Sequence, residues 1–474
     1  MSYIKSAYIN ALLADAAYID LPVGTIVQDQ LKDKEGTLSR RMTLPLAKFI
    51  ADNFEVINTR LAHDIPVLDS GFDAIVWKGR KGTPYEGKIF LSARGTESGT
   101  DMLIADVDLT INSLARSQAI DMINWWSRIT TERGKPALQV EYRDRYVYDE
   151  HAGHDIFIGR EFVLAPAVQG EGLISAEDLA RGVQVNGHSL GGHLASAFAR
   201  IFGRQTHIEH VSTFNSVGFA PDSDAIFQQL QGLLPQEYGL PSFPDAQLQS
   251  NYFAGNGINV TTNSFYFNQV GRRISLFQEE GTGLTNHYMY RLTDMLALGN
   301  TLEKLAPDLS IEALNQIVSS GSHIAKGSLE GVLDAVRRFI HGTNIESLPA
   351  SDASDSDEGR VKFHETLAQL QADPAYRALE GKLRIQPAGA IAPQQACEDF
   401  AAFVSLYTLS PVAITCTDSQ ALNALWQSEA WKEVYQNWQA DKAARAAGRP
   451  AAHYSEQWYT ELNQIGRASC RERV

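Results

Sequence analysis

The chain has 474 residues, of which 44% are hydrophobic and 20% charged, a composition typical of a globular protein with a sizeable core. Its formal net charge of −15 argues against nucleic acid and anionic membranes as electrostatic partners. No run approaches the ~18 apolar residues that a transmembrane helix needs, so we expect no transmembrane segment.

The two ends of the chain and its three cysteines each support a prediction about processing or covalent structure. The first residues lack the sustained apolar stretch of a cleaved secretory signal. We therefore predict no particular cellular location, and any export would use a route that needs no signal peptide. Residues 465–474 can be back-translated into the read-through of a sequencing adapter, and we expect a non-native tail there. Cys397, Cys416 and Cys470 form neither a disulfide framework nor a zinc pattern, and free thiols are favoured over a Cys397–Cys416 bridge.

The first 93 residues predict two helices and then two strands. Helix-prone stretches at 5–18 and 45–54 predict helices laid on the core. Two β-prone runs, 72–78 and 88–93, are joined by a polar loop and predict an antiparallel pair.

The loop after the second run carries a candidate oxyanion donor. Thr96 follows Gly95, and its N–H, with its hydroxyl in support, is placed to bind a developing negative charge. The alternative is an ordinary polar residue in a glycine turn. The following stretch, 101–114, mixes acids with large apolar residues and predicts either a flap that opens on a lipid surface or a buried strand and helix start. A core-packing helix is expected at 115–131.

Residues 182–203 predict a strand, a tight turn and a helix. Gly187 and Gly191 flank Ser189 with one residue between on each side, and apolar residues then recur at helical spacing up to Gly203. This is the context of a nucleophile elbow, in which a strained turn exposes the serine. We therefore predict Ser189 as a nucleophile and the N–H of Leu190 as an oxyanion donor; the alternative is an ordinary turn.

The segments around the elbow predict a mostly parallel α/β sheet. Short β runs at 139–148 and 155–164 indicate an insertion before the elbow strand, and 210–218 predicts the next parallel strand. The Leu-rich excursion 222–247 either lines an acyl-chain site or packs a helix. Residues 249–278 return to β character.

A serine nucleophile needs a histidine base that follows it in the chain. Seven histidines come too early or lie beside the elbow: His63, His151, His154, His188, His193, His207 and His210. His287 lies in a polar loop before a helix expected at 290–298, whereas His323 and His341 fall in helical segments. We therefore predict His287 as the base.

The acid that orients the histidine has several candidates. Glu279 follows the β run 273–278 and is the predicted acid. The alternatives are Glu280, Asp245, Asp222 and Asp224.

With these residues the chain resembles the class 3 lipases, α/β-hydrolases that act on acyl glycerols and phospholipids. The resemblance covers about 70–300 and rests on Arg94-Gly95-Thr96 followed by Asp101 and Asp106, on Gly187-His188-Ser189-Leu190-Gly191, and on Ser212-Thr213-Phe214-Asn215. It implies Ser189 as nucleophile, Thr96 and Leu190 as oxyanion-hole residues, and a lid after Thr96.

The chain departs from that family at the acid. Where the family usually shows an aspartate, this sequence offers Asn259, Asn263 and Asn268, which leaves Glu279 as the substitute. Residues 287–345 are also similar to large bacterial lipases, some of which carry calcium-binding repeats after the catalytic part and are secreted without a signal peptide.

The last third of the chain is expected to be helical. Apolar residues recur at helical spacing in 311–318, 327–340 and 363–370. Residues 351–359 lack the ligand spacing of an EF-hand loop and predict a solvated linker.

The sequence thus predicts an α/β-hydrolase fold with a helical C-terminal extension. The expected parts are an N-terminal segment at 1–70, a catalytic domain at 71–300, a helical region at 301–464 and the non-native tail. The expected function is a serine carboxylic-ester hydrolase that acts on triacylglycerols or phospholipids, touches a lipid interface transiently, and needs no metal or organic cofactor. The alternatives are a small-ester esterase and a catalytically decayed hydrolase-fold binding module.

Overall fold

The computed structural model describes most of the chain. The described residues are 3–26, 28–31, 42–60, 70–95, 116–221, 223–255, 267–278, 285–321, 327–349, 357–387, 392–416 and 422–462. The flap expected at 101–114 and the tail at 465–474 lie outside them.

An eight-stranded sheet forms the centre of the fold, in the order β1-β2-β3-β4-β7-β8-β9-β10. The strands are β1 (Gly24–Thr25), β2 (Phe54–Arg60), β3 (Ala74–Gly79), β4 (Ile89–Ala93), β7 (Val183–His188), β8 (Ile208–Phe214), β9 (Gln249–Ala254) and β10 (Arg272–Leu276). Pairing is antiparallel from β1 to β4 and parallel from β4 to β10. This mixed, largely parallel sheet and the helical C-terminal region confirm the predicted α/β class.

Helices cover both faces of the sheet because its strands are apolar on both sides. In β3, Ile75 and Trp77 belong to one hydrophobic core, and Ala74 and Val76 to the other. The first core includes α1 (Tyr3–Ala16), α2 (Leu44–Asn53) and α7 (Met289–Leu305), and the second includes the helix 116–130, α5 (Leu190–Phe202) and α6 (Ser223–Leu233). The helices expected at 5–18, 45–54, 115–131 and 290–298 are thus confirmed.

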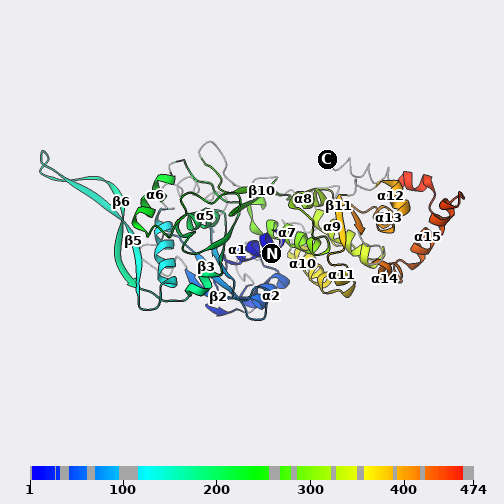
Figure 1. Cartoon of the computed structure of the whole chain (residues 1–474), viewed down its shortest axis with the longest axis horizontal. Helices are drawn as coiled ribbons and strands as arrows, with labels where there is room; N and C mark the ends of the chain where they lie inside the picture. The colour runs from blue at the N-terminus through cyan, green and yellow to red at the C-terminus, as the bar shows by residue number, and fades with distance from the viewer. Residues whose placement is uncertain are drawn as a thin grey trace.

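A long two-stranded ribbon extends from the body at the end opposite the C-terminal helices (Figure 1). It consists of β5 (Pro136–Asp149) and β6 (His154–Gln169), paired antiparallel outside the central sheet. At its base, Val140 and Phe162 are buried in the second core, whereas Tyr148 is 61% exposed near the tip. The two β runs predicted before the elbow strand are therefore one hairpin, longer than expected.

The C-terminal region is mainly helical and continuous with the first core. Its helices are α8 (Ile311–Ser319), α9 (Ser328–His341), α10 (Asp357–Ala372), α11 (Pro374–Ala378), α12 (Pro393–Glu398), α13 (Phe400–Tyr407), α14 (Asn423–Trp426) and α15 (Lys432–Ala446). The sequence did not predict its small antiparallel sheet, β11 (Leu383–Pro387) with β12 (Val412–Cys416). Cys397 and Cys416 are free thiols, as favoured.

The linker predicted at 351–359 is wrong at its end, because α10 already begins at Asp357. The buried Arg360 in its first turn binds Asp294 of α7, which holds the start of this helix on the core. In the part of the chain described, no helix combines the length and apolar character needed to cross a bilayer.

Candidate active site

Ser189 occupies a strained turn between β7 and α5. Its φ of 57° and ψ of −125° lie outside the regions that a residue with a Cβ ordinarily adopts. The turn is held by its own N–H, which donates to the Phe214 oxygen of the neighbouring strand at 2.9 Å. The predicted strand, tight turn and helix are therefore confirmed, and Ser189 has the backbone of a nucleophile elbow.

Two glycines allow this turn to form. A Cβ on Gly187 would lie 2.2 Å from the Gly191 oxygen, and a Cβ on Gly191 would lie 2.1 Å from the Ala93 oxygen. Both distances are far below van der Waals contact, so the start of α5 can approach β7 and the end of β4 only with glycine at these positions.

The loop after β4 lies against the serine. A Cβ built on Gly95 would be 3.2 Å from the Ser189 Cβ and 2.6 Å from the His188 oxygen. Thr96, the next residue, lies outside the described residues, and its oxyanion role stays a prediction. Leu190 is the first residue of α5, where N–H groups have no carbonyl partner within the helix.

His287 is brought to the elbow by main-chain contacts. It ends the short 3₁₀ helix η3 (Thr285–His287) and is 3% exposed. Its oxygen lies 2.7 Å from His188 Nε2, and the centroids of the two imidazole rings are 4.7 Å apart. Between Ser189 and His287 the structure has no hydrogen bond; such bonds often tighten only around a bound substrate.

Asn215 joins three chain segments beside the elbow. Its Nδ2 donates to the oxygens of Asn286 at 3.0 Å and His287 at 2.9 Å, while its Oδ1 accepts the Ala254 N–H at 2.9 Å. It is fully buried, at a φ of 42°, which asparagine tolerates better than most residues. Asn215 therefore fixes the His287 segment to the carboxyl ends of β8 and β9.

The predicted acid, Glu279, lies outside the described residues, as do Glu280 and Asp222. The strand before Glu279 is described: β10 ends at Leu276, which pairs with Ala254 at the end of β9. Since β7 to β10 are parallel, this strand end lies at the same edge of the sheet as Ser189. β10 thus ends, three residues before Glu279, at the edge of the sheet where Ser189 lies.

Two alternative acids have other positions. Asp245 caps the turn before β9, accepting the N–H groups of Gln247 and Leu248, and so lies at the opposite, amino end of the parallel strands. Asp224 pairs at 3.1 Å with Arg200, which is eleven residues or roughly 16 Å beyond Ser189 along α5. These positions place neither carboxylate beside His287.

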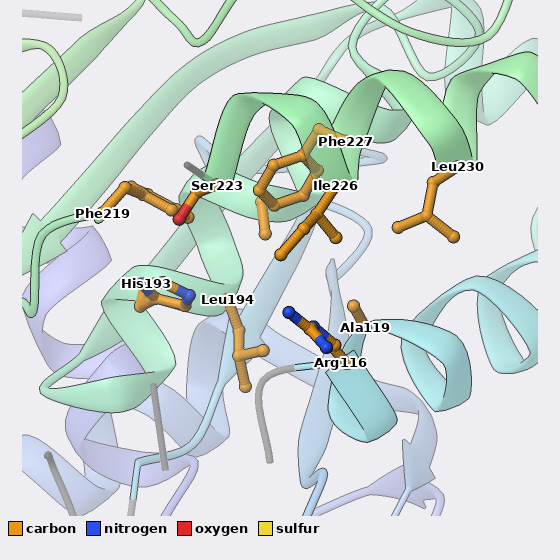
Figure 2. A pocket seen from close by; sticks show the side chains of 10 residues that line it. Arg116, Ala119, His193, Leu194, Phe219, Ser223, Ile226, Phe227 and Leu230 are labelled. Carbon is orange, nitrogen blue, oxygen red and sulfur yellow. The ribbon is translucent and has the colours of Figure 1, made fainter. Parts of the chain in front are cut away.

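An apolar pocket opens between α5, α6 and the helix 116–130 (Figure 2). Its free space, part of which is open to solvent, is about 450 Å³, and it is lined by Arg116, Ala119, His193, Leu194, Ala197, Phe219, Ser223, Ile226, Phe227 and Leu230. Leu194 follows Ser189 by five residues, about 7.5 Å along the axis of α5. From the excursion 222–247, which was expected to line an acyl-chain site or to pack a helix, Phe227 and Leu230 line this pocket.

His193, on the pocket wall, is a buried neutral imidazole. Its Nδ1 lies 3.2 Å from the Gly218 oxygen, and its ring stacks on Phe219 at a centroid distance of 4.0 Å. Burial lowers the pKa of His193 from 6.5 to about 4, although hydrogen bonds to main-chain oxygens partly oppose this. It therefore contributes apolar surface and no charge at neutral pH.

Three residues that contact the site have no role assigned to them from the sequence: Tyr18, His188 and Asn215. Asn215 lies within the predicted parallel strand 210–218 and directly after the observed β8, whose carboxyl end lies at the site edge, so its position in the sequence was a usable signal. His188 was set aside because it adjoins the serine. Tyr18 is 170 residues from His188, and no local pattern indicates their contact.

Comparisons with known proteins add no relative. No protein-family model and no curated protein sequence matches the chain. Among the described side chains, no group of three or more His, Cys, Asp or Glu residues could hold a metal ion. The interpretation of the site therefore rests on its geometry.

Proposed function

We propose that the chain is a serine carboxylic-ester hydrolase with an α/β-hydrolase fold. The observation that carries this proposal is the Ser189 turn, which is strained, buried between glycines, and next to both Gly95 and the His287 segment. Such strain persists only where the surrounding structure imposes it, and it is concentrated at functional sites.

The proposed reaction proceeds through an acyl-enzyme. His287 takes the Ser189 hydroxyl proton while Oγ attacks the ester carbonyl, and the N–H groups of Leu190 and Thr96 bind the oxyanion. The imidazolium then donates its proton to the leaving alcohol. Water, deprotonated by His287, attacks the acyl-enzyme. The imidazolium returns this proton to Ser189 Oγ as the acyl–oxygen bond breaks and the acid leaves, and Glu279 orients the imidazole throughout.

A lipid ester is the proposed substrate, either a triacylglycerol or a phospholipid. The apolar pocket beside α5 supports this choice, because a hydrocarbon chain gains ~0.8 kcal/mol for each buried methylene. The runner-up is a small-ester esterase. The two differ in whether the rate jumps when the substrate forms an interface.

The test is hydrolysis of emulsified triglyceride and of phosphatidylcholine liposomes by the full chain, Ser189→Ala and Glu279→Gln. Loss of activity in both variants would support nucleophile and acid together, whereas loss only in Ser189→Ala would move the acid elsewhere. If the parent chain hydrolyses none of the esters tested, a hydrolase-fold binding module is favoured and the proposal is contradicted.

A further inference from the structure

The Tyr18 hydroxyl lies in the middle of a hydrogen-bond chain across the site. It accepts the Gly95 N–H at 3.1 Å and lies 2.8 Å from His188 Nδ1. At the other side of the imidazole, His188 Nε2 lies 2.7 Å from the His287 oxygen. A carbonyl oxygen only accepts, so Nε2 carries the proton and, in the neutral imidazole, Nδ1 accepts from the Tyr18 hydroxyl.

The residues that form these hydrogen bonds through the Tyr18 hydroxyl, the His188 imidazole and the His287 oxygen are shielded from water. Tyr18 is 7% exposed, His188 4% and His287 3%. The rings of Tyr18 and His188 meet edge to face at 5.7 Å, and the Arg94 guanidinium lies 5.7 Å from the Tyr18 ring centroid. In such surroundings a hydrogen bond is strong, so the loss of one of these bonds is costly.

The ends of the chain are the two loops that the proposed reaction depends on. Gly95 precedes by one residue the predicted oxyanion donor Thr96, and the His287 oxygen belongs to the predicted base itself. Tyr18 comes from the N-terminal segment directly after α1, outside the expected catalytic domain. One hydroxyl therefore connects the oxyanion loop, the elbow and the base loop.

We propose that Tyr18 is a positioning residue that aligns the oxyanion loop with the base loop through His188. The inference rests on the proposed function, because the aligned groups are those of ester hydrolysis. Among the described residues, the Tyr18 hydroxyl bonds to Gly95 and His188 and not to the side chains of Ser189 or His287. It acts by holding main-chain groups whose misplacement by a fraction of an ångström lowers the rate.

Tyr18→Phe tests this by removing only the hydroxyl. We expect kcat for a soluble ester to fall at least ~10-fold with KM within about twofold, since alignment changes and ground-state binding does not. The matched control is Tyr376→Phe, which loses a buried hydroxyl that donates to the Thr301 oxygen at 2.6 Å, outside the site. Equal kcat values in the two variants would overturn the proposal.

Amide hydrogen exchange provides a readout that needs no activity. In Tyr18→Phe the exchange rate should rise about fivefold at Gly95 and also across 285–288, the expected scale for one lost hydrogen bond. Tyr376→Phe should leave both segments unchanged. A rise at Gly95 alone would refute the coupling. If the parent chain hydrolyses no ester but Tyr18→Phe still raises exchange in both segments, the proposed function is refuted and the coupling stands.

Discussion

His188 Nε2 donates to the main-chain oxygen of His287 at 2.7 Å, although the two residues are 99 positions apart. The residue directly before the predicted nucleophile thus holds the backbone of the predicted base. The same oxygen also accepts from Asn215 Nδ2 at 2.9 Å, so two side chains fix its position.

Replacing Asn215 should uncouple the base loop from the sheet. Asn215→Gly keeps the freedom needed at a φ of 42° but removes the amide and with it the hydrogen bonds to Ala254, Asn286 and His287. We expect the free energy of unfolding to fall by roughly 2 kcal/mol and ester hydrolysis to drop with it. Chemical denaturation measures the first quantity and initial rates the second.

Asn215→Ala should lower the free energy of unfolding by a further ~1 kcal/mol, because alanine is strained at positive φ. An alanine variant as stable as the glycine variant would contradict this.

Acid should destabilise the fold through His193. Its pKa is about 4 in the folded chain and near 6.5 when unfolded, so the unfolded state binds the extra proton between these values. Stability is therefore unaffected above pH 6.5 and falls as the pH drops toward 4, by up to roughly 3 kcal/mol.

The measurement is the pH dependence of urea unfolding in His193→Leu. In this variant the free energy of unfolding should depend less steeply on pH between 6.5 and 4, by the equivalent of about one bound proton. His151→Leu is the control, because the His151 side chain is 100% exposed. Equal slopes in His193→Leu and the parent chain would show that His193 titrates normally.

The buried pair Asp294–Arg360 should be essential for docking α10 on α7. Both Arg360 Nε and Nη2 donate to Asp294, with Nε···Oδ2 at 2.7 Å, and His364 Nε2 lies 2.7 Å from Asp294 Oδ1. Burial alone would raise the pKa of Asp294, but the charges and hydrogen bonds of Arg360 and His364 outweigh it and lower this pKa to about 2. The carboxylate is therefore charged at neutral pH.

Asp294→Asn should cost about 3–5 kcal/mol of unfolding free energy, because it removes the carboxylate that contributes most to stabilising the buried Arg360 charge. The matched control is Asp52→Asn, which breaks the Lys48–Asp52 pair, whose side chains are 63% and 57% exposed. We expect that variant to lose less than ~1 kcal/mol. Similar losses in the two variants, measured by denaturant unfolding, would refute the docking role.

Filling the apolar pocket should change the preference for acyl-chain length. Ala197 lines the pocket, and Ala197→Leu adds three carbon atoms there. If these exclude two methylenes of the substrate, hydrolysis of long-chain esters should fall roughly tenfold, while acetate esters stay within about twofold. Steady-state kinetics on a series of p-nitrophenyl esters measures this. An equal loss on every chain length would show that the pocket does not hold the acyl chain.

The sequence predicted those features whose cause is local. The elbow could be predicted because Gly187, Ser189 and Gly191 impose their geometry within five residues, and the strands and helices around it because their hydrophobic periods are strong. The contact of Tyr18 with His188 could not, since it depends on how α1 packs across the sheet. Likewise, β11 and β12 are short strands whose pairing arises from tertiary contacts, with no turn motif to indicate it.

The most direct test of the account is covalent labelling of the full chain with a fluorophosphonate, followed by intact-mass measurement and peptide mapping. A Ser189 nucleophile predicts one adduct per chain, on Ser189, with loss of ester hydrolysis in proportion to labelling and no adduct in Ser189→Ala. An unlabelled Ser189 in a chain that hydrolyses esters, or undiminished hydrolysis by Ser189→Ala, would contradict it.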